Sequence, residues 1–339
     1  SYNLGIDFSF FQSWLSSTLE IYKKVGEDQV IQKTLAPSTG ANYVAINDGD
    51  VNNSGWELSV NVNPIHGKDW NWGISFNTAK NYNKVKNAGE EFSVTWSDYV
   101  NGTLVRNGRS INSFYAYRFK GLNDEGLPTF YGESEKDEDG VAIITTQEEA
   151  FDAAFVYAGR REPTLSGGFS TNVRFKRLTM NANFSFALGN KILLNNLYYE
   201  SGQALPFPQQ NMSSEFVDRW REPGDDTVIP ALSDDAMTFG PYDRKYPIAN
   251  NRWDMYNKSD LRVVSGDFLR CRSLSLRYDI APEWLRKFYI TAASLSFDVS
   301  NPFVFKSKDL KGRDPEQVTM GSGTVPPQRG YSLRLNVSF

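Results

Sequence analysis

The residue types that carry most enzyme chemistry are scarce in this chain of 339 residues. It has a single Cys (Cys271) and a single His (His66), which excludes a disulfide framework, a Cys/His zinc site and a Cys–His or Ser–His nucleophile pair. Asp225/Asp226 and Asp234/Asp235 are carboxylate pairs, but sequence neighbours rarely converge on one scissile bond as a glycosidase requires. We therefore expect a protein that is not an enzyme and that carries no cofactor.

Residue types that suit ligand binding gather in one long segment, residues 193–260. Aromatic rings with polar and charged neighbours suit sugar or peptide ligands. The alternative is that these rings pack the long loop or contact a partner, and a short helix over 214–220 that pairs Phe216 with Trp220 would favour packing for those two. The candidate substrate-contacting residues are Arg219, Trp220, Tyr242, Tyr246, Trp253 and Tyr256.

An acidic segment, residues 133–140, contains the only weak candidate for a metal site, Asp137 and Asp139. A calcium loop with Gly140 at its sixth position needs an acidic twelfth ligand, and Thr146 stands there. A solvated acidic turn is the simpler interpretation. We therefore predict no metal site.

The composition favours β-structure. Aromatic residues make up 14% of the chain and charged residues 22%, values typical of neither a disordered chain nor a bundle of membrane helices. The net charge of −4 argues against binding through nucleic-acid phosphates. No apolar run approaches the roughly 18 residues of a membrane-spanning helix.

Apolar and polar residues alternate along most of the chain, which predicts about eleven strands. The connections alternate between short ones (near 12–14, 64–69, 176–178 and 281–288) and long ones (26–53, 85–109, 133–164, 193–260 and 305–328). Short turns on one side and long loops on the other are typical of an outer-membrane barrel, whereas a soluble β-sandwich shares only the alternation. We expect the turns on the periplasmic side, Arg174, Arg277, Glu57 and Arg334 facing the lumen, and Phe175, Leu276, Leu58 and Leu335 facing lipid.

Two local patterns predict finer features. Thr146 and Glu149 form a capping box and Gly159 a stop signal, which together predict a surface helix over 147–158. Pro302 lacks an N–H group, so the strand before it is expected to end early.

Seven motifs in order along the chain resemble those of one transporter family. Taken together, they resemble the C-terminal part of SusC/RagA-family TonB-dependent outer-membrane transporters. The motifs are Tyr2-Asn3-Leu4-Gly5-Ile6-Asp7 with Leu19-Glu20-Ile21-Tyr22; Asn53-Ser54-Gly55-Trp56-Glu57-Leu58; Ser113-Phe114-Tyr115-Ala116-Tyr117-Arg118; Gly159 to Pro163 with Gly167-Gly168-Phe169; Arg219-Trp220 with Pro223-Gly224-Asp225; Gly266-Asp267-Phe268-Leu269-Arg270; and Asn301-Pro302-Phe303 with Gly312-Arg313-Asp314-Pro315-Glu316.

The resemblance implies an all-β fold in which residues 1–339 form the C-terminal half of a 22-stranded transmembrane antiparallel barrel in the bacterial outer membrane. It implies that the N-terminal barrel half, the plug domain and the TonB-contacting segment would precede Ser1, since an open half-barrel would leave unpaired strand edges in lipid. Its expected function is TonB-dependent import of oligosaccharides or oligopeptides together with a SusD-like lipoprotein lid over the long loops. The alternative function is a soluble β-rich glycan-binding module or adhesin. The resemblance also implies that the last strand carries the barrel-assembly signal, Tyr331, Leu333, Leu335, Val337 and Phe339.

Overall fold

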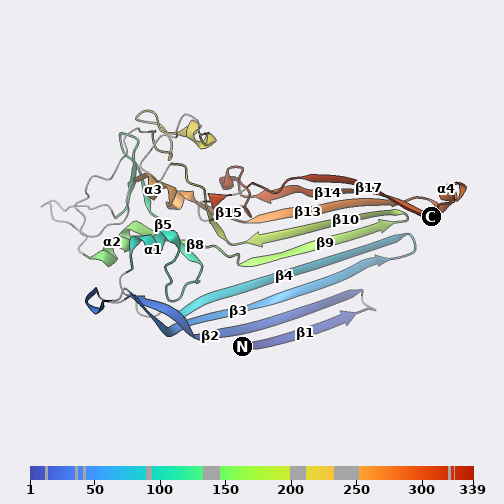
Figure 1. The fold of residues 1–339 in the computed structure, drawn as a ribbon, viewed down its shortest axis with the longest axis horizontal. Coiled ribbons are helices and arrows are strands. Elements are labelled where there is room, and N and C mark those ends of the chain that lie inside the picture. The colour runs from blue at the N-terminus through green and yellow to red at the C-terminus, as the bar shows by residue number, and fades with distance from the viewer. Residues whose placement is uncertain are drawn as a thin grey trace.

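A nine-stranded antiparallel sheet forms the body of the molecule, in the order β1-β2-β3-β4-β9-β10-β13-β14-β17 (Figure 1). The computed structural model describes residues 1–11, 14–34, 37–40, 43–88, 94–132, 146–198, 211–232, 252–319, 322–323 and 325–339. The strands are β1 (Tyr2–Phe10), β2 (Leu15–Thr34), β3 (Tyr43–His66), β4 (Trp70–Asn87), β9 (Leu165–Phe175), β10 (Leu178–Leu188), β13 (Phe268–Asp279), β14 (Ala292–Lys306) and β17 (Gly330–Ser338).

Hydrogen-bonded partners across this sheet separate the side chains into an apolar face and a polar face. Cross-strand partners point to the same face, and successive residues of a strand point to opposite faces. One row across all nine strands is apolar except for one Thr: Phe10, Leu15, Val62, Ile74, Thr171, Ala182, Leu274, Val299 and Tyr331. The adjacent row on the other face has only Ser, Asn and Gly: Ser9, Ser16, Asn61, Ser75, Ser170, Asn183, Ser273, Ser300 and Gly330.

This separation is the one that a membrane barrel requires, with apolar side chains toward lipid and polar side chains toward the lumen. Arg174, Arg277 and Arg334 belong to one polar row, as expected, because Arg174 and Arg277 both pair with Thr179 and Arg277 and Arg334 both pair with Ser296. The all-β expectation is confirmed.

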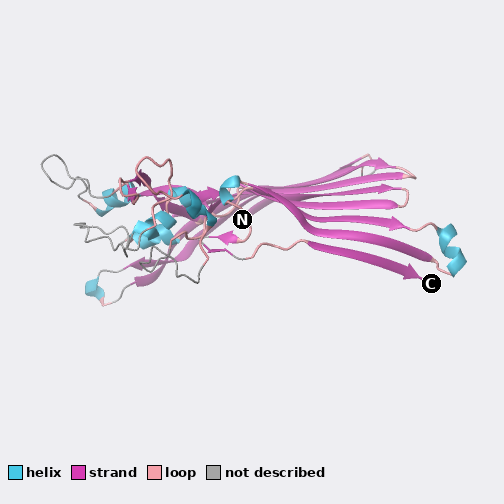
Figure 2. Cartoon of the chain, turned by 90° about the horizontal axis from the view of Figure 1, so that it is seen from above, coloured by secondary structure: helices cyan, strands magenta, loops and turns pink. Residues whose placement is uncertain are grey.

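The two ends of the sheet differ, as the connection lengths predicted. Tight connections join β1 to β2, β3 to β4, β9 to β10 and β13 to β14 at one end, the last through α4 (Pro282–Leu285) and η4 (Arg286–Phe288). We call this the turn end, on the right in Figure 1. The remaining small elements gather at the opposite, loop end, and Figure 2 shows their helices on the left, beside the extended ends of strands.

The small elements at the loop end have the following bounds. They are η1 (Pro37–Thr39), α1 (Trp96–Asn101), β5 (Ser113–Tyr117), β6 (Phe119–Leu122), β7 (Pro128–Phe130), α2 (Gln147–Ala154), β8 (Phe155–Arg160), β11 (Lys191–Leu193), η2 (Ser214–Asp218), α3 (Arg252–Asn257), η3 (Asp260–Arg262), β12 (Val263–Ser265), η5 (Lys308–Leu310), β15 (Val318–Thr319) and β16 (Ser322–Gly323).

Four expectations need correction. The large sheet has nine strands among the described residues, not about eleven, because β5 and β8 pair with each other in a separate sheet. Strands β2 and β3 continue far into 26–53, where each face mixes apolar and polar residues, as the adjacent pairs Val30–Asn47 and Ile31–Ile46 show, and the alternation is lost. The helix predicted over 147–158 ends at Ala154, and Gly159 lies inside β8 with φ of 122°. Strand β14 does not end at Pro302; it bulges there, with Asn301 at φ of 49° and a register shift opposite Cys271.

Within the described part of the chain, no helix is long and apolar enough to cross a membrane.

Candidate functional site

The loop end is held together by its own aromatic core, which we call the loop core. Tyr99 stacks on Phe155 with ring centroids 4.4 Å apart, and Tyr198 stacks on Trp253 at the same distance. Stacked and edge-to-face ring pairs add to the stabilisation that burial alone provides. The other buried rings of the loop core are Tyr115, Tyr117, Phe130, Phe151, Phe216 and Tyr256.

Elements distant in the sequence meet in this core because polar groups fix their backbones. The fully buried Asn257, at the end of α3, accepts hydrogen bonds from the backbone N–H groups of Leu197 and Tyr198 at 2.8 and 3.1 Å. Its amide donates to the carbonyl oxygen of Tyr198 at 2.7 Å, and the Tyr198 hydroxyl donates to the carbonyl oxygen of Pro230 at 2.6 Å. These hydrogen bonds therefore tie the segments before β12 and after β11 together around the loop core.

The predicted substrate-contacting residues lie in different surroundings. Trp253 and Tyr256 are 0% and 2% exposed in the loop core, which is the packing alternative that the sequence left open for these rings. Burial raises the pKa of Tyr256 to about 12, so its hydroxyl stays neutral. Tyr242 and Tyr246 lie outside the described residues.

Arg219 and Trp220, by contrast, are half-buried at the surface of the loop end. The Arg219 guanidinium donates to the carbonyl oxygen of Phe216 at 2.9 Å, and the backbone N–H of Trp220 donates to that of Ile229 at 2.9 Å. The Trp220 ring packs directly on Gly126, where an added Cβ would lie 2.3 Å from the ring. These two residues are thus fixed at their bases and partly open to solvent, and their substrate role stays a prediction.

The turn that follows Trp220 is held by a carboxylate. Asp225 accepts hydrogen bonds from the backbone N–H groups of Arg221 and Glu222 at 2.7 and 3.2 Å, and Gly224 has φ of 103°. This carboxylate therefore satisfies local backbone groups and has a structural task. The residues of the other adjacent pair, Asp234 and Asp235, lie outside the described residues.

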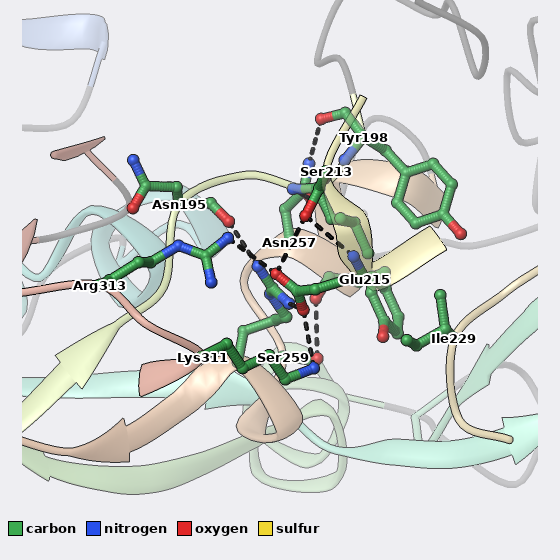
Figure 3. Close-up of polar contacts among 12 residues, drawn as sticks. Asn195, Tyr198, Ser213, Glu215, Ile229, Asn257, Ser259, Lys311 and Arg313 are labelled. Atoms are coloured by element: carbon green, nitrogen blue, oxygen red, sulfur yellow. Dashed lines mark hydrogen bonds and ion pairs between the residues drawn. The ribbon is translucent and has the colours of Figure 1, made fainter. Parts of the chain in front are cut away.

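A buried carboxylate, Glu215, joins three segments of the loop end (Figure 3). It accepts hydrogen bonds from Arg262 at 2.6 Å, from Lys311 at 2.8 Å and from Arg313 at 2.7 Å. Burial alone would raise the pKa of Glu215, but the charge of Arg262 and these hydrogen bonds lower it to about 2. Glu215 is therefore ionised at any physiological pH and ties η2 to η3 and to the segment after η5.

A second ion-pair group ties that segment to the sheet. Arg270 of β13 is 3% exposed and donates to both carboxylate oxygens of Asp314, at 2.7 and 2.6 Å, and to Glu316 at 2.5 Å. Arg272 also pairs with Glu316. Residues 313–316, Arg-Asp-Pro-Glu, thus connect the loop end to the sheet. Arg313 binds Glu215 at the loop end, and the carboxylates of Asp314 and Glu316 bind Arg270 on the polar face of β13.

The sequence reading did not single out these charged residues as a group. Arg270 and residues 313–316 belong to the sequence motifs, but Glu215, Arg262 and Lys311 do not. Glu215 and its cations are 47 to 98 positions apart, so only the fold brings them together. Within the described ranges, no group of three or more His, Cys, Asp or Glu side chains is placed to hold a metal ion. Asp137 and Asp139 lie outside those ranges. The described part of the loop end is thus an assembly held by buried rings, backbone hydrogen bonds and buried ion pairs.

Comparison with known proteins gives a consistent result along the whole chain. No family model matches it. TonB-dependent receptor P3 of Formosa agariphila is 25% identical over 99% of this chain, and TonB-dependent receptor SusC of Bacteroides thetaiotaomicron is 25% identical over 100% of it. The chain spans about a third of the length of these curated relatives, 34% and 31% respectively.

Solved structures agree with this result on the fold. The structure of the RagAB peptide transporter matches 99% of this chain with a TM-score of 0.72 and 22% identity, and covers 35% of that chain. The "closed-closed" state of the RagAB peptide importer matches with a TM-score of 0.71. Along its whole length the chain is thus similar to TonB-dependent receptors of the SusC type, which are outer-membrane proteins, and its fold matches part of the RagAB transporter structure.

Proposed function

We propose that the protein containing this chain imports oligomeric nutrients, oligosaccharides or oligopeptides, across the outer membrane with energy delivered through TonB. The single observation that supports this most is the nine-strand sheet with one apolar and one polar face, joined at one end to a loop assembly packed around buried aromatic rings. A wall of this kind encloses a wet lumen and presents binding groups at its mouth.

The proposed partners follow from this role. The remainder of the transporter pairs with the edge strands β1 and β17, TonB acts through a region outside this chain, and a SusD-like lipoprotein caps the long loops. The ion-paired segments around Glu215 and Arg270 support a lid, because a partner that opens and closes needs a firm surface to close upon. Tyr, Trp and Arg side chains dominate interface hot spots, and Arg219, Trp220 and Tyr131, which is 41% exposed, supply them at the loop end.

Growth and uptake experiments test the proposal. A strain lacking the full-length protein should lose growth on either an oligopeptide mixture or an oligosaccharide mixture as the sole nutrient, and a strain lacking TonB should lose it equally. The name of the RagAB peptide transporter makes oligopeptides the first class to try. Unimpaired growth on every oligomer tested, with monomer growth as the control, would refute import.

A variant pair links uptake to the loop end. Trp220→Ala should weaken substrate binding by about 30-fold, the equivalent of a 2 kcal/mol hot spot. Trp284→Ala, at the turn end and 66% exposed in the wild-type chain, is the matched control and should leave binding unchanged. The alternative function, a glycan-binding module, is favoured if the full-length protein purifies without detergent.

A further inference from the structure

Three lysines lie on the apolar face of the sheet near the loop end. Lys23 of β2 is on this face because it is eight residues from Leu15 in a regular stretch of strand. Lys80 and Lys84 of β4 are on it because they are six and ten residues from Ile74. The face that meets lipid therefore carries three positive charges, which we call the lysine group.

The strand register centres the lysine group on one small residue, Ser54 of β3. Ser54 pairs with Lys23 of β2 on one side and with Tyr82 of β4 on the other. Lys80 and Lys84 lie two residues before and two residues after Tyr82. Neighbouring strands are about 4.8 Å apart, so the Cα of Lys23 is about 10 Å from the backbone of β4. Long, flexible lysine side chains on both sides of a small residue can reach one ligand that lies over it.

The described strands place no carboxylate on the apolar face in the three rows that hold these lysines. The carboxylates at this height, Glu20 and Glu57, pair with each other on the polar face. Asp50 lies one row further toward the loops and accepts a hydrogen bond from the backbone N–H of Asp28 at 3.3 Å. The apolar-face residues of the three rows are Val25, Asn52 and Lys84; Tyr2, Lys23, Ser54 and Tyr82; and Leu4, Ile21, Trp56, Lys80 and Leu165.

Lys80 shows which way a charge of the lysine group points. Its own row is otherwise apolar, and includes Ile21 and Trp56. Its ammonium nevertheless lies 4.9 Å from the centroid of the Tyr82 ring, one row nearer the loop end. A lysine at the edge of an apolar band extends its charge toward the polar boundary in this way. The ammonium is thus held at the edge of the band by an aromatic ring that is itself 46% exposed.

The distance along β4 places the lysine group at the outer boundary of the apolar band. Trp70, at the turn end of β4, packs against Phe175 with ring centroids 4.4 Å apart, and Tyr82 is twelve residues further along the strand. Twelve residues make about 40 Å of strand and about 30 Å of membrane depth at a tilt of about 40°. The apolar band of an outer-membrane barrel is about 25 Å tall and has aromatic residues at both edges. Trp70 and Tyr82 match these two edges, so the lysine group faces the headgroups of the outer leaflet.

We propose that the lysine group binds a phosphate of lipopolysaccharide, the anionic glycolipid of the outer leaflet. The phosphorylated sugars of its lipid A part lie at the boundary of the apolar band, and its acyl chains lie against the apolar rows below. Lysine binds phosphate as a point charge, and cations near a membrane surface add their attractions to anionic headgroups. Three cations around Ser54, with no carboxylate in their rows, match one multiply charged group. The site depends on the outward orientation of the loop end and not on which nutrient is imported, so the two proposals can fail separately.

Lipid titration of the full-length transporter tests the chemistry of the site. The protein is purified in mild detergent free of lipopolysaccharide, and native mass spectrometry counts the lipid A molecules that bind as lipid A is added. Lipid A with its phosphates should bind about 100-fold more tightly than lipid A from which the phosphates have been removed enzymatically. Equal binding of the two forms overturns the proposal. Equal binding of phosphatidylglycerol, a phosphate lipid without the sugar part, overturns the assignment to a glycolipid.

Two triple variants test the location of the site. Lys23→Gln, Lys80→Gln and Lys84→Gln together should lower the affinity for phosphorylated lipid A about 100-fold. The matched control, Lys24→Gln, Lys68→Gln and Lys287→Gln, removes the same charge from exposed positions on the polar face and at the turn end, and should keep the wild-type affinity. Unchanged affinity in the first variant, or equal losses in both, overturns the proposal.

A single variant decides if the first triple variant does not assemble. Lys84 is exposed and lies at the polar edge of the lysine group, so Lys84→Gln disturbs no packing. It should lower the affinity for phosphorylated lipid A about fivefold and leave the weak binding of dephosphorylated lipid A unchanged. Equal affinity of Lys84→Gln and the wild-type protein for phosphorylated lipid A overturns the proposal.

Discussion

At the scale of single residues, Glu215 joins η2 to η3 and to the segment after η5 through hydrogen bonds with Arg262, Lys311 and Arg313. Its pKa is about 2, below the ordinary value of 4.5. The stability that its ionised form contributes is therefore fully present above about pH 4.5 and is lost as the pH falls toward 2.

Glu215→Gln tests this role. It leaves the guanidinium of Arg262, itself 2% exposed, buried beside a neutral group, and breaking a buried pair in this way costs about 3–5 kcal/mol. Hydrogen exchange of residues 211–232 should show faster opening at pH 7 and no further loss of protection between pH 4.5 and 3. The exposed Glu222→Gln is the control and should retain the wild-type pH profile. Equal protection in both variants would show that the pair does not hold this loop.

Gly126 offers a second test at this scale, since it combines a left-handed backbone, φ of 74°, with a ring placed directly over it. Gly126→Ala should destabilise the loop end by the backbone term of about 1–2 kcal/mol and also displace Trp220. Gly312→Ala has a similar φ of 85° but nothing within 4 Å of the new Cβ, so it measures the backbone term alone. Limited proteolysis of the loop end should rank Gly126→Ala as the more sensitive variant, and equal sensitivity would contradict the contact with Trp220.

At the scale of elements, the two faces of the sheet predict opposite responses to one substitution at neighbouring positions. Leu276 pairs with Met180 and Phe297 on the apolar face, whereas Ser275 pairs with Asn181 and Asp298 on the polar face. Leu276→Arg should lower the stability of the barrel by about 2–4 kcal/mol, the cost of a charge near the bilayer midplane. Ser275→Arg should be tolerated. Unfolding of the full-length transporter in vesicles by urea measures both, and similar losses would mean that the faces are wrongly assigned.

In the last strand, β17, Tyr331 and Leu335 pair with Val299 and Leu295 of β14. Its role as the signal for barrel assembly is implied by resemblance alone and stays a prediction. Deleting Phe339, which is 88% exposed and makes little contact within the chain, should reduce the amount of protein in the outer membrane without altering the stability of what assembles. Outer-membrane levels equal to those of the wild-type transporter would contradict the signal.

The elements that the sequence could predict are those in which one physical pattern dominates. The alternation in β10 or β17 is strict because one face meets lipid, so period two alone located these strands. The extension of β2 and β3 beyond Gly26 was missed because apolar and polar residues do not alternate there, as in the adjacent apolar residues Val30 and Ile31. The helix that begins at Gln147 was predicted too long because its capping box marks only a start, and Gly159 was mistaken for its end. The charge group at Glu215 could not be predicted at all, because its members come from two separate connections, that between β10 and β13 and that between β14 and β17, which only the fold brings together.

At the scale of the whole molecule, the division into a turn end and a loop end predicts how the protein lies in the membrane. Long loops of outer-membrane barrels face outward and short turns face the periplasm.

The native Cys271 is buried, at 1% exposure, so an introduced thiol can be labelled without interference. Lys68→Cys places one in the turn between β3 and β4, and Glu222→Cys places one at the loop end; both positions are exposed. A membrane-impermeant maleimide added to intact cells that express the full-length transporter should label the Cys at 222 and not the Cys at 68, and both should react once the outer membrane is permeabilised. Labelling of position 68 in intact cells, with 222 protected, would reverse the orientation. It would also place the loop end in the periplasm, where it could meet neither an external nutrient nor a surface lipoprotein. The proposed import route and its lid therefore depend on this result more than on any single contact within the chain.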